Sequence, residues 1–357
     1  MLTLEHLLRK MVDIGASDLH ITVGTTPKFR IDGALFNASD IILDQKDTER
    51  LCLEPLSDEQ IKLFKRQKEL DFSFGIQGLS RFRVNLFFQR GSIGGTFRTI
   101  PFQIPKLEEL GLPPIIKDLA KQPRGLLLVT GPTGSGKSTT LAAIIDWINE
   151  NYEKHIITIE DPIEFIHRHK RSLVNQREVG TDTESFKNAL RRVLRQDPDI
   201  VLIGEMRDLE TTEAALNISE TGHLTLATLH TNNAVQTINR IIDIFPHHQQ
   251  NQIRSVLAFV LLGIVSQLLV ARDDSSGRIL VTEILIATPA IRSLIRDGKV
   301  HQIYAQMQMG QAHSQMHTMN QSLINLVKKG IIRPETALQV SPEEEELRQK
   351  LGPLSHP

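Results

Sequence analysis

Eight residues from Gly131 to Ser138 have the types and spacing that bind the phosphates of a nucleotide. They match the P-loop pattern G-x-x-x-x-G-K-[ST]. Glycines let the backbone curl so that several N–H groups point at one anion, and the start of a following helix adds positive charge there. Lys137 can reach the β- and γ-phosphates, and the Ser138 hydroxyl can ligate Mg²⁺. The sequence therefore predicts a site for ATP and Mg²⁺ with these nucleotide-binding residues: Gly131, Pro132, Thr133, Gly134, Ser135, Gly136, Lys137, Ser138 and Thr139.

The segments on both sides of this loop agree with that interpretation. Residues 126–129 form a short apolar run typical of a buried strand, and residues 139–150 predict a helix. A glycine-rich turn that binds nothing is the alternative. The flanking strand and helix disfavour it, because a P-loop connects these two kinds of element.

A nucleotide hydrolase also needs an acidic group near Mg²⁺ at the end of a second strand. The apolar run 200–203 predicts that strand, and Glu205 follows it. Gly204 stands where the acid usually comes directly after the run, but the longer glutamate side chain can still reach Mg²⁺ through water. We therefore expect Glu205 to act in catalysis and metal binding. An exposed carboxylate at a strand end is the alternative.

Two further clusters follow predicted strands. Glu160, Asp161 and Glu164 come after the strand 156–160, beside the expected γ-phosphate position, where a carboxylate can position or deprotonate water. The alternative is an acidic surface turn. His223 and His230 bracket the strand 223–229, where a polar group can sense the γ-phosphate; structural roles for both are the alternative.

The elements that must position these residues change character near residue 124. Beyond it, strands at 125–130, 156–160, 199–204, 223–229 and 279–286 alternate with helices, which predicts an α/β domain with a largely parallel sheet and a RecA-like core. The apolar run 256–265 is interpreted as a buried helix. The N-terminal third alternates short strands with turns. We predict an N-terminal α+β domain over 1–99, a proline-rich linker over 100–114 and the ATPase domain over 115–357.

Composition excludes several classes of protein. The 357 residues include 41 basic and 42 acidic ones, for a net charge of −1, which disfavours a nucleic-acid motor. The sequence contains no N-K-x-D motif for guanine recognition, which disfavours a GTPase. The single Cys52 excludes an internal disulfide and a cysteine-built zinc site. No signal peptide or membrane-spanning run is visible, so we expect a cytoplasmic protein that contacts a membrane only through a partner.

Taken together, the clusters resemble the secretion-type ATPases of type II secretion and type IV pili, and most nearly the pilus retraction ATPases. Residues 15–20 look like the N-terminal signature of that family. Residues 160–164 are similar to its Asp box, 203–208 to its Walker B segment and 221–232 to its His box. Residues 290–297 resemble a C-terminal helix motif associated with retraction, with Ser293 and Asp297 in place of the commoner Asn and Glu.

The resemblance implies a PAS-like N-terminal domain, a homohexameric ring and a location at the pilus base, on the inner face of the inner membrane. It implies pilin depolymerisation and twitching motility, with an inner-membrane platform protein as partner. Arg81, Arg83 and Arg98 of the N-terminal sheet are then candidates to stabilise the transition state; surface-strand arginines are the alternative.

Three alternatives remain within this class of protein. Pilus assembly and type II secretion ATPases typically carry an extra N-terminal domain and a four-cysteine zinc insertion, and this chain shows neither. An accessory retraction paralogue without hydrolysis is disfavoured by the complete set of carboxylates and histidines.

In the 290–297 helix, Arg292 and Arg296 are interpreted as coupling nucleotide state to the pilus machinery. A core helix with solvated arginines is the alternative.

Overall fold

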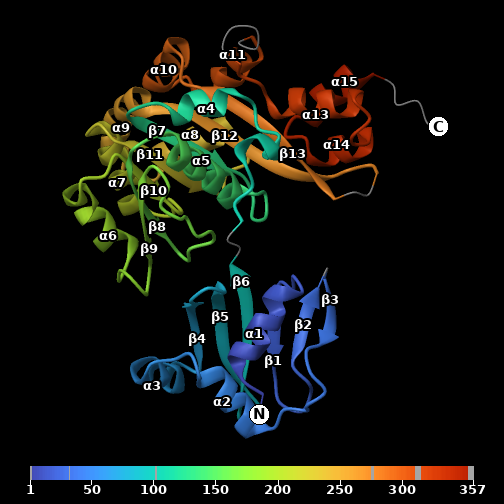
Figure 1. Ribbon diagram of the computed structural model, residues 1–357. Helices are drawn as coiled ribbons and strands as arrows, with labels where there is room; N and C mark the ends of the chain where they lie inside the picture. The colour runs from blue at the N-terminus through green and yellow to red at the C-terminus, as the bar shows by residue number, and fades with distance from the viewer. Residues whose placement is uncertain (1, 32, 101–102, 275–276, 310–314, 353–357) are drawn as a thin grey trace. The chain divides into compact units, whose positions relative to one another are not determined.

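The structure, a computed structural model, describes residues 2–31, 33–100, 103–274, 277–309 and 315–352. It divides into two compact units (Figure 1). The first contains Met1–Gln103 and Pro162–Ile166, and the second contains Ile104–Asp161 and His167–Pro357. Among the described residues, no helix combines the length and apolar character needed to cross a membrane.

The first unit is built on a six-stranded antiparallel sheet in the order β3-β2-β1-β6-β5-β4. Its core forms because apolar residues face inward: Leu7, Leu8 and Met11 of α1 are fully buried. Along β5, buried positions alternate with more exposed ones that include Arg83. The elements are α1 (Leu4–Asp13), β1 (Asp18–Ile21), β2 (Lys28–Ile31), β3 (Ala34–Asn37), α2 (Gln45–Leu53), α3 (Asp58–Gln67), β4 (Glu69–Ile76), β5 (Ser80–Gln89) and β6 (Ser92–Ile100).

Cys52, on α2, lies within this first core. Its side chain is fully buried, and burial raises the pKa of the thiol to about 12. The thiolate is the reactive form of cysteine, so this side chain behaves as a small apolar residue.

The second unit is built on a seven-stranded sheet in the order β13-β12-β7-β11-β10-β8-β9. Every neighbouring pair is parallel except β12 with β13. Its first elements are η1 (Leu107–Leu110), α4 (Ile115–Ala120), β7 (Gly125–Thr130), α5 (Lys137–Asn151), β8 (His155–Glu160), β9 (Leu173–Glu178), α6 (Phe186–Val193), η2 (Leu194–Gln196), β10 (Ile200–Ile203), α7 (Leu209–Glu220) and β11 (Leu224–Leu229). The rest are α8 (Ala234–Asp243), α9 (His247–Val260), β12 (Leu261–Ala271), β13 (Arg278–Ile286), α10 (Pro289–Arg296), η3 (Val300–Gln302), α11 (Ile303–Met309), α13 (Met319–Lys328), α14 (Pro334–Val340) and α15 (Glu344–Leu351).

Helices cover both faces of this sheet, so its central strands are buried on both sides (Figure 1). Along β7, Leu126 and Leu128 face the core shared with α6 to α10, while Leu127 and Val129 face the core shared with α4 and α5. This two-sided burial explains why the predicted strands are continuous apolar runs. The predicted α/β fold class is confirmed, and β7, which leads into the P-loop, lies inside the sheet.

Two parts of the second unit differ from the predictions. The run 256–265 is not one buried helix: α9 ends at Val260 and β12 begins at Leu261, which has an extended backbone. A strand buried on both faces shows no alternation, so periodicity does not separate it from a buried helix.

Within the predicted linker, Leu107 is buried in the core beside α5, with Ile104 and Leu110 packed against it. The structure therefore divides at residues 103 and 104, whereas the predicted bounds leave the segment 100–114 between the domains.

Candidate nucleotide site at the carboxyl ends of the parallel strands

The P-loop connects the end of β7 to the start of α5, as predicted. Gly131 and Gly136 have φ of 145° and 86°, values that side chains rarely allow. Gly136 is the N-cap of α5, so the free N–H groups of a 15-residue helix face the loop. The side chain of Lys137 is buried, and its Nζ donates to the carbonyl oxygens of Gly131 (2.9 Å) and Pro132 (3.0 Å). The loop thus has the shape of an anion cradle with its cation folded across it.

Two predicted residues meet at the ends of the neighbouring strands β10 and β11. Glu205 follows β10 and His230 follows β11, and His230 Nε2 lies 3.4 Å from Glu205 Oε1. Arg207 Nε lies 2.8 Å from Glu205 Oε2. The hydrogen bond to Glu205 raises the pKa of Arg207, and the charges of Glu205 and Asp161 add to this effect. Sequence reasoning missed Arg207, although it stands only two residues after the predicted carboxylate.

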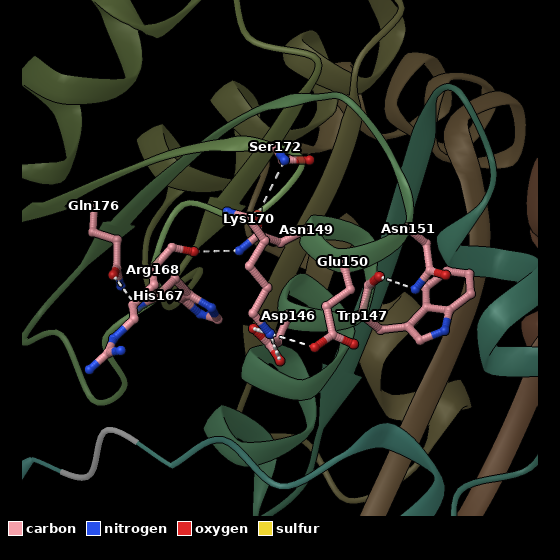
Figure 2. A network of polar contacts seen from close by, with 10 residues as sticks. All are labelled: Asp146, Trp147, Asn149, Glu150, Asn151, His167, Arg168, Lys170, Ser172 and Gln176. Carbon is pink, nitrogen blue, oxygen red and sulfur yellow. Dashed lines mark hydrogen bonds and ion pairs between the residues drawn. The ribbon is translucent and has the colours of Figure 1, made fainter.

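The carboxylates after β8 differ in how tightly they are held. Glu160 Oε1 accepts hydrogen bonds from Thr158 Oγ1 (2.6 Å) and Gln176 Nε2 (3.2 Å). Gln176 in turn accepts the backbone N–H of His167 at 2.8 Å (Figure 2). Asp161 and Glu164 are exposed. The structure therefore fixes Glu160 on the sheet and leaves the two other carboxylates at the surface of the chain.

A buried asparagine ties the segment after these carboxylates to the P-loop helix (Figure 2). Asn149, near the end of α5, donates to the Arg168 carbonyl (2.7 Å) and accepts the N–H groups of Lys170 (3.1 Å) and Ser172 (3.3 Å). The Lys170 ammonium adds ion pairs to Asp146 (2.8 Å) and Glu150 (2.6 Å) of the same helix. The helix that starts at the P-loop and the segment 167–172 are therefore one hydrogen-bonded assembly.

His223 does not join these residues. It precedes β11 and its carbonyl accepts the N–H of Gly125, the first residue of β7, so it lies at the opposite edge of the sheet from the P-loop. Its Nδ1 contacts the Ile218 carbonyl at 3.1 Å. Six residues of β11 separate it from His230, so the two histidines are seven steps apart, a span of about 23 Å at about 3.3 Å per residue. Of the two candidate histidines, only His230 therefore lies at the P-loop end of this sheet, and a sensing role for His223 stays a prediction.

The three candidate arginines of the first unit have different surroundings. Arg98 Nε donates to Asp18 Oδ1 at 2.8 Å, and Asp18 is buried. Burial opposes ionisation of Asp18, but hydrogen bonds from Ser17 and Arg98 and the charge of Arg98 lower its pKa overall. Arg81 Nη2 donates to Ser73 Oγ at 2.6 Å, and Arg83 is exposed. An approach of these arginines to a nucleotide stays a prediction.

The C-terminal helix motif has a structural arginine that the sequence did not reveal. Arg292 of α10 donates through Nε to its own Ala287 carbonyl (2.9 Å). Its two other nitrogens reach the carbonyls of Ala258, Phe259 (2.6 Å) and Leu261 (2.7 Å), where α9 passes into β12. Arg296 is exposed. Arg292 therefore caps the end of α9, and a role of either arginine in coupling nucleotide state to the pilus machinery stays a prediction.

A P-loop after a central parallel strand, with a carboxylate and a histidine on the adjacent strand ends, defines a P-loop nucleotide hydrolase. Within that class, the chain belongs to the type II/IV secretion system protein family, whose profile matches residues 103–339. This confirms the resemblance drawn from the motifs.

Two individual relatives and one solved structure are similar to this chain over most of its length. The type IV pilus retraction ATPase PilT of Pseudomonas aeruginosa is 49% identical over 90% of this chain and 93% of its own length. The type IV pilus ATPase PilU of the same organism is 44% identical over 98% of this chain and 91% of its own length. A crystal structure of the pilus retraction motor PilT with bound ADP matches with a TM-score of 0.91 and 49% identity, covering 97% of this chain and 99% of that one.

Proposed function

We propose that this chain is an ATPase that powers retraction of a type IV pilus, by depolymerising pilin during twitching motility. One observation carries the proposal. The P-loop, Glu205 and His230 lie at the carboxyl ends of strands in one sheet, in a chain that matches a retraction ATPase over 93% of that protein's length. The ADP in the related crystal structure supports a nucleotide as the ligand of this cradle.

The residues fit ATP with Mg²⁺. The P-loop N–H groups and Lys137 would hold the phosphates, and the half-exposed Ser138 hydroxyl beside the loop would hold the metal with Glu205. Mg²⁺ would neutralise charge that develops on the phosphate oxygens. Among the carboxylates after β8, Asp161 is exposed and its charge raises the pKa of Arg207, which pairs with Glu205. It is therefore the best placed of the three to orient water, with Glu160 as its fixed neighbour.

His230 has a place suited to sensing the nucleotide. It contacts Glu205 from the next strand, so a change at the metal and γ-phosphate would alter the charge that this imidazole meets. We further propose that six copies form a ring on the cytoplasmic face of the inner membrane, and that the ring acts on a platform protein of the pilus base. Arg81, Arg83 and Arg98 then remain candidates to approach the nucleotide.

A second candidate is an accessory subunit of the same retraction machine. One organism has two pilus ATPases that are both similar to this chain, so the similarity alone does not decide which of two such subunits the chain corresponds to. Deletion of the gene separates the possibilities. A hyperpiliated cell that does not twitch is expected for the main retraction motor, a bald cell for an assembly motor, and a cell with near-normal twitching for an accessory subunit.

Complementation makes this test specific. The wild-type gene should restore twitching, and the Lys137→Ala variant should not, because a ring without phosphate binding delivers no work. Restoration by Lys137→Ala would contradict an ATP-driven role in the cell. Phosphate release by the purified wild-type chain should be measured beside it.

A further inference from the structure

Gln267 is a buried amide in β12, a strand in which Ser266 is the other polar side chain. Its side chain is 1% exposed, and Leu268 and Leu269 follow it in the strand. Nε2 donates to the Ser135 carbonyl of the P-loop at 2.8 Å. Among the residues that the structure describes, Oε1 has no hydrogen-bond partner. Burial of an amide with an unpartnered acceptor costs stability. If packing alone mattered, a methionine would serve better here.

Gln267 lies against both ends of the P-loop. The pairing of Ser266 with Thr130 places Gln267 beside Gly131. A Cβ atom added to Gly131 would lie 2.3 Å from the Gln267 carbonyl oxygen, closer than atoms approach. A Cβ added to Gly136 would lie 3.3 Å from Nε2. The first and last glycines of the loop are therefore fitted against this one residue.

The hydrogen bond to Ser135 has a directional consequence. In a trans peptide the C=O and the N–H of one peptide plane point in opposite directions. A Ser135 carbonyl held toward β12 therefore holds the Gly136 N–H away from β12. Without this bond the plane can rotate and the N–H loses its orientation. A fixed N–H is what an anion cradle needs, because an oriented dipole requires no reorganisation when phosphate arrives.

We propose that Gln267 is a positioning residue for the nucleotide, which orients the Gly136 N–H toward the phosphates through the Ser135 carbonyl. This inference rests on the proposed function as an ATPase. Nothing in the P-loop pattern marks a glutamine about 130 residues later in the chain. The ligand class is a nucleoside di- or triphosphate, and the effect is on binding in the ground state.

The test is Gln267→Met in the full-length chain. Methionine has similar length and no donor, so the bond to Ser135 disappears while the volume is kept. We expect ADP to bind about fivefold more weakly or worse, the value of one net hydrogen bond of about 1 kcal/mol. The KM for ATP should rise by a similar factor with kcat nearly unchanged, because the N–H contacts phosphate before and during the reaction. The thermal midpoint without nucleotide should change little, because the variant removes one unpartnered acceptor, Oε1, and leaves another, the Ser135 carbonyl, without its donor.

Thr282→Val is the matched control. Thr282 pairs with Gln267 across the β12–β13 ribbon, is 5% exposed, and hydrogen-bonds His317 Nε2 at 3.0 Å. Its loss should lower the thermal midpoint and leave ADP affinity unchanged. Equal losses of affinity in the two variants would overturn the positioning role, because a general loosening of the ribbon would then explain both.

Gln267→Glu supplies a readout that a packing role does not move. An ionised carboxylate has no proton to donate to Ser135 and repels phosphate, whereas the protonated acid regains the bond. ADP affinity relative to the wild type should therefore recover as pH falls from about 8 to about 6, since burial raises the pKa of a carboxyl group. The same ratio for Gln267→Met should stay flat. If Gln267→Met does not fold, the pH dependence of ADP affinity in Gln267→Glu tests the positioning role in its place.

The outcomes separate this inference from the proposed function. Normal ADP binding by the wild type, with binding by Gln267→Met within about twofold of it, overturns the positioning role alone. A wild-type chain that does not bind ADP overturns the proposed function and this inference together.

Discussion

Replacement of Arg292 by alanine should destabilise the second unit, because its guanidinium caps the junction between α9 and β12. Four backbone carbonyls lose a charged donor, two of them at 2.6 and 2.7 Å. A hydrogen bond from a charged group contributes about 1.5–3 kcal/mol, and a cation at a helix C-terminus about 0.3–1 kcal/mol. Arg292 is only half-buried and water replaces some of these bonds, so we discount the sum to about 3 kcal/mol.

The assay is thermal unfolding of the purified chain, followed by circular dichroism. A loss of about 3 kcal/mol should lower the midpoint by roughly 6–12 °C in a unit of this size. Arg292→Lys should fall between alanine and the wild type, since one ammonium group does not reach four carbonyls in a planar array. Arg296→Ala is the control on the same helix, and its exposed side chain predicts a change within about 0.5 kcal/mol.

A stable Arg292→Ala variant would refute this reasoning. If its midpoint stays within about 2 °C of the wild type while cells that carry it no longer twitch, Arg292 serves the pilus machinery rather than the fold. A lower midpoint with proportionate loss of ATPase activity supports the capping role.

Three further predictions follow from the site. Lys137→Ala should abolish phosphate release by the purified chain, because this ammonium is the P-loop's own cation; retention of most activity would contradict the site. Glu205→Ala should bind ADP normally but hydrolyse ATP at least about tenfold more slowly, a barrier increase of about 1.4 kcal/mol, and unchanged turnover would show that the metal site lies elsewhere. Burial lowers the pKa of His167 from 6.5 to about 4, so its neutral form contributes stability that is complete above pH 6.5 and is lost as pH falls toward 4. His167→Gln should flatten the thermal midpoint against pH in that window, and an unchanged slope would assign the acid sensitivity to other groups.

The sequence predicted the P-loop, its flanking elements and the Glu205 cluster because each is local: a motif beside an apolar run. It did not predict β12 or Gln267, since a strand buried on both faces has no period and one glutamine in it has no pattern. The hydrogen bonds of Arg292 were missed for a different reason. The carbonyls that it binds belong to α9, and no spacing within α10 reveals them. The separation of His223 from His230 could have been predicted, because the two ends of a parallel strand lie at opposite edges of its sheet.

The buried thiol of Cys52 has a practical consequence for measurement. It is the only cysteine in the chain, and a pKa of about 12 leaves almost no thiolate at neutral pH. Maleimide dyes should therefore not react with the wild-type protein, and Cys52 can stay in place during labelling. One cysteine introduced at exposed Lys62 and another at exposed Glu213 would accept a donor and an acceptor dye, one on each unit. Energy transfer between them would then report, molecule by molecule, how the distance between the two units changes as ATP is bound and hydrolysed.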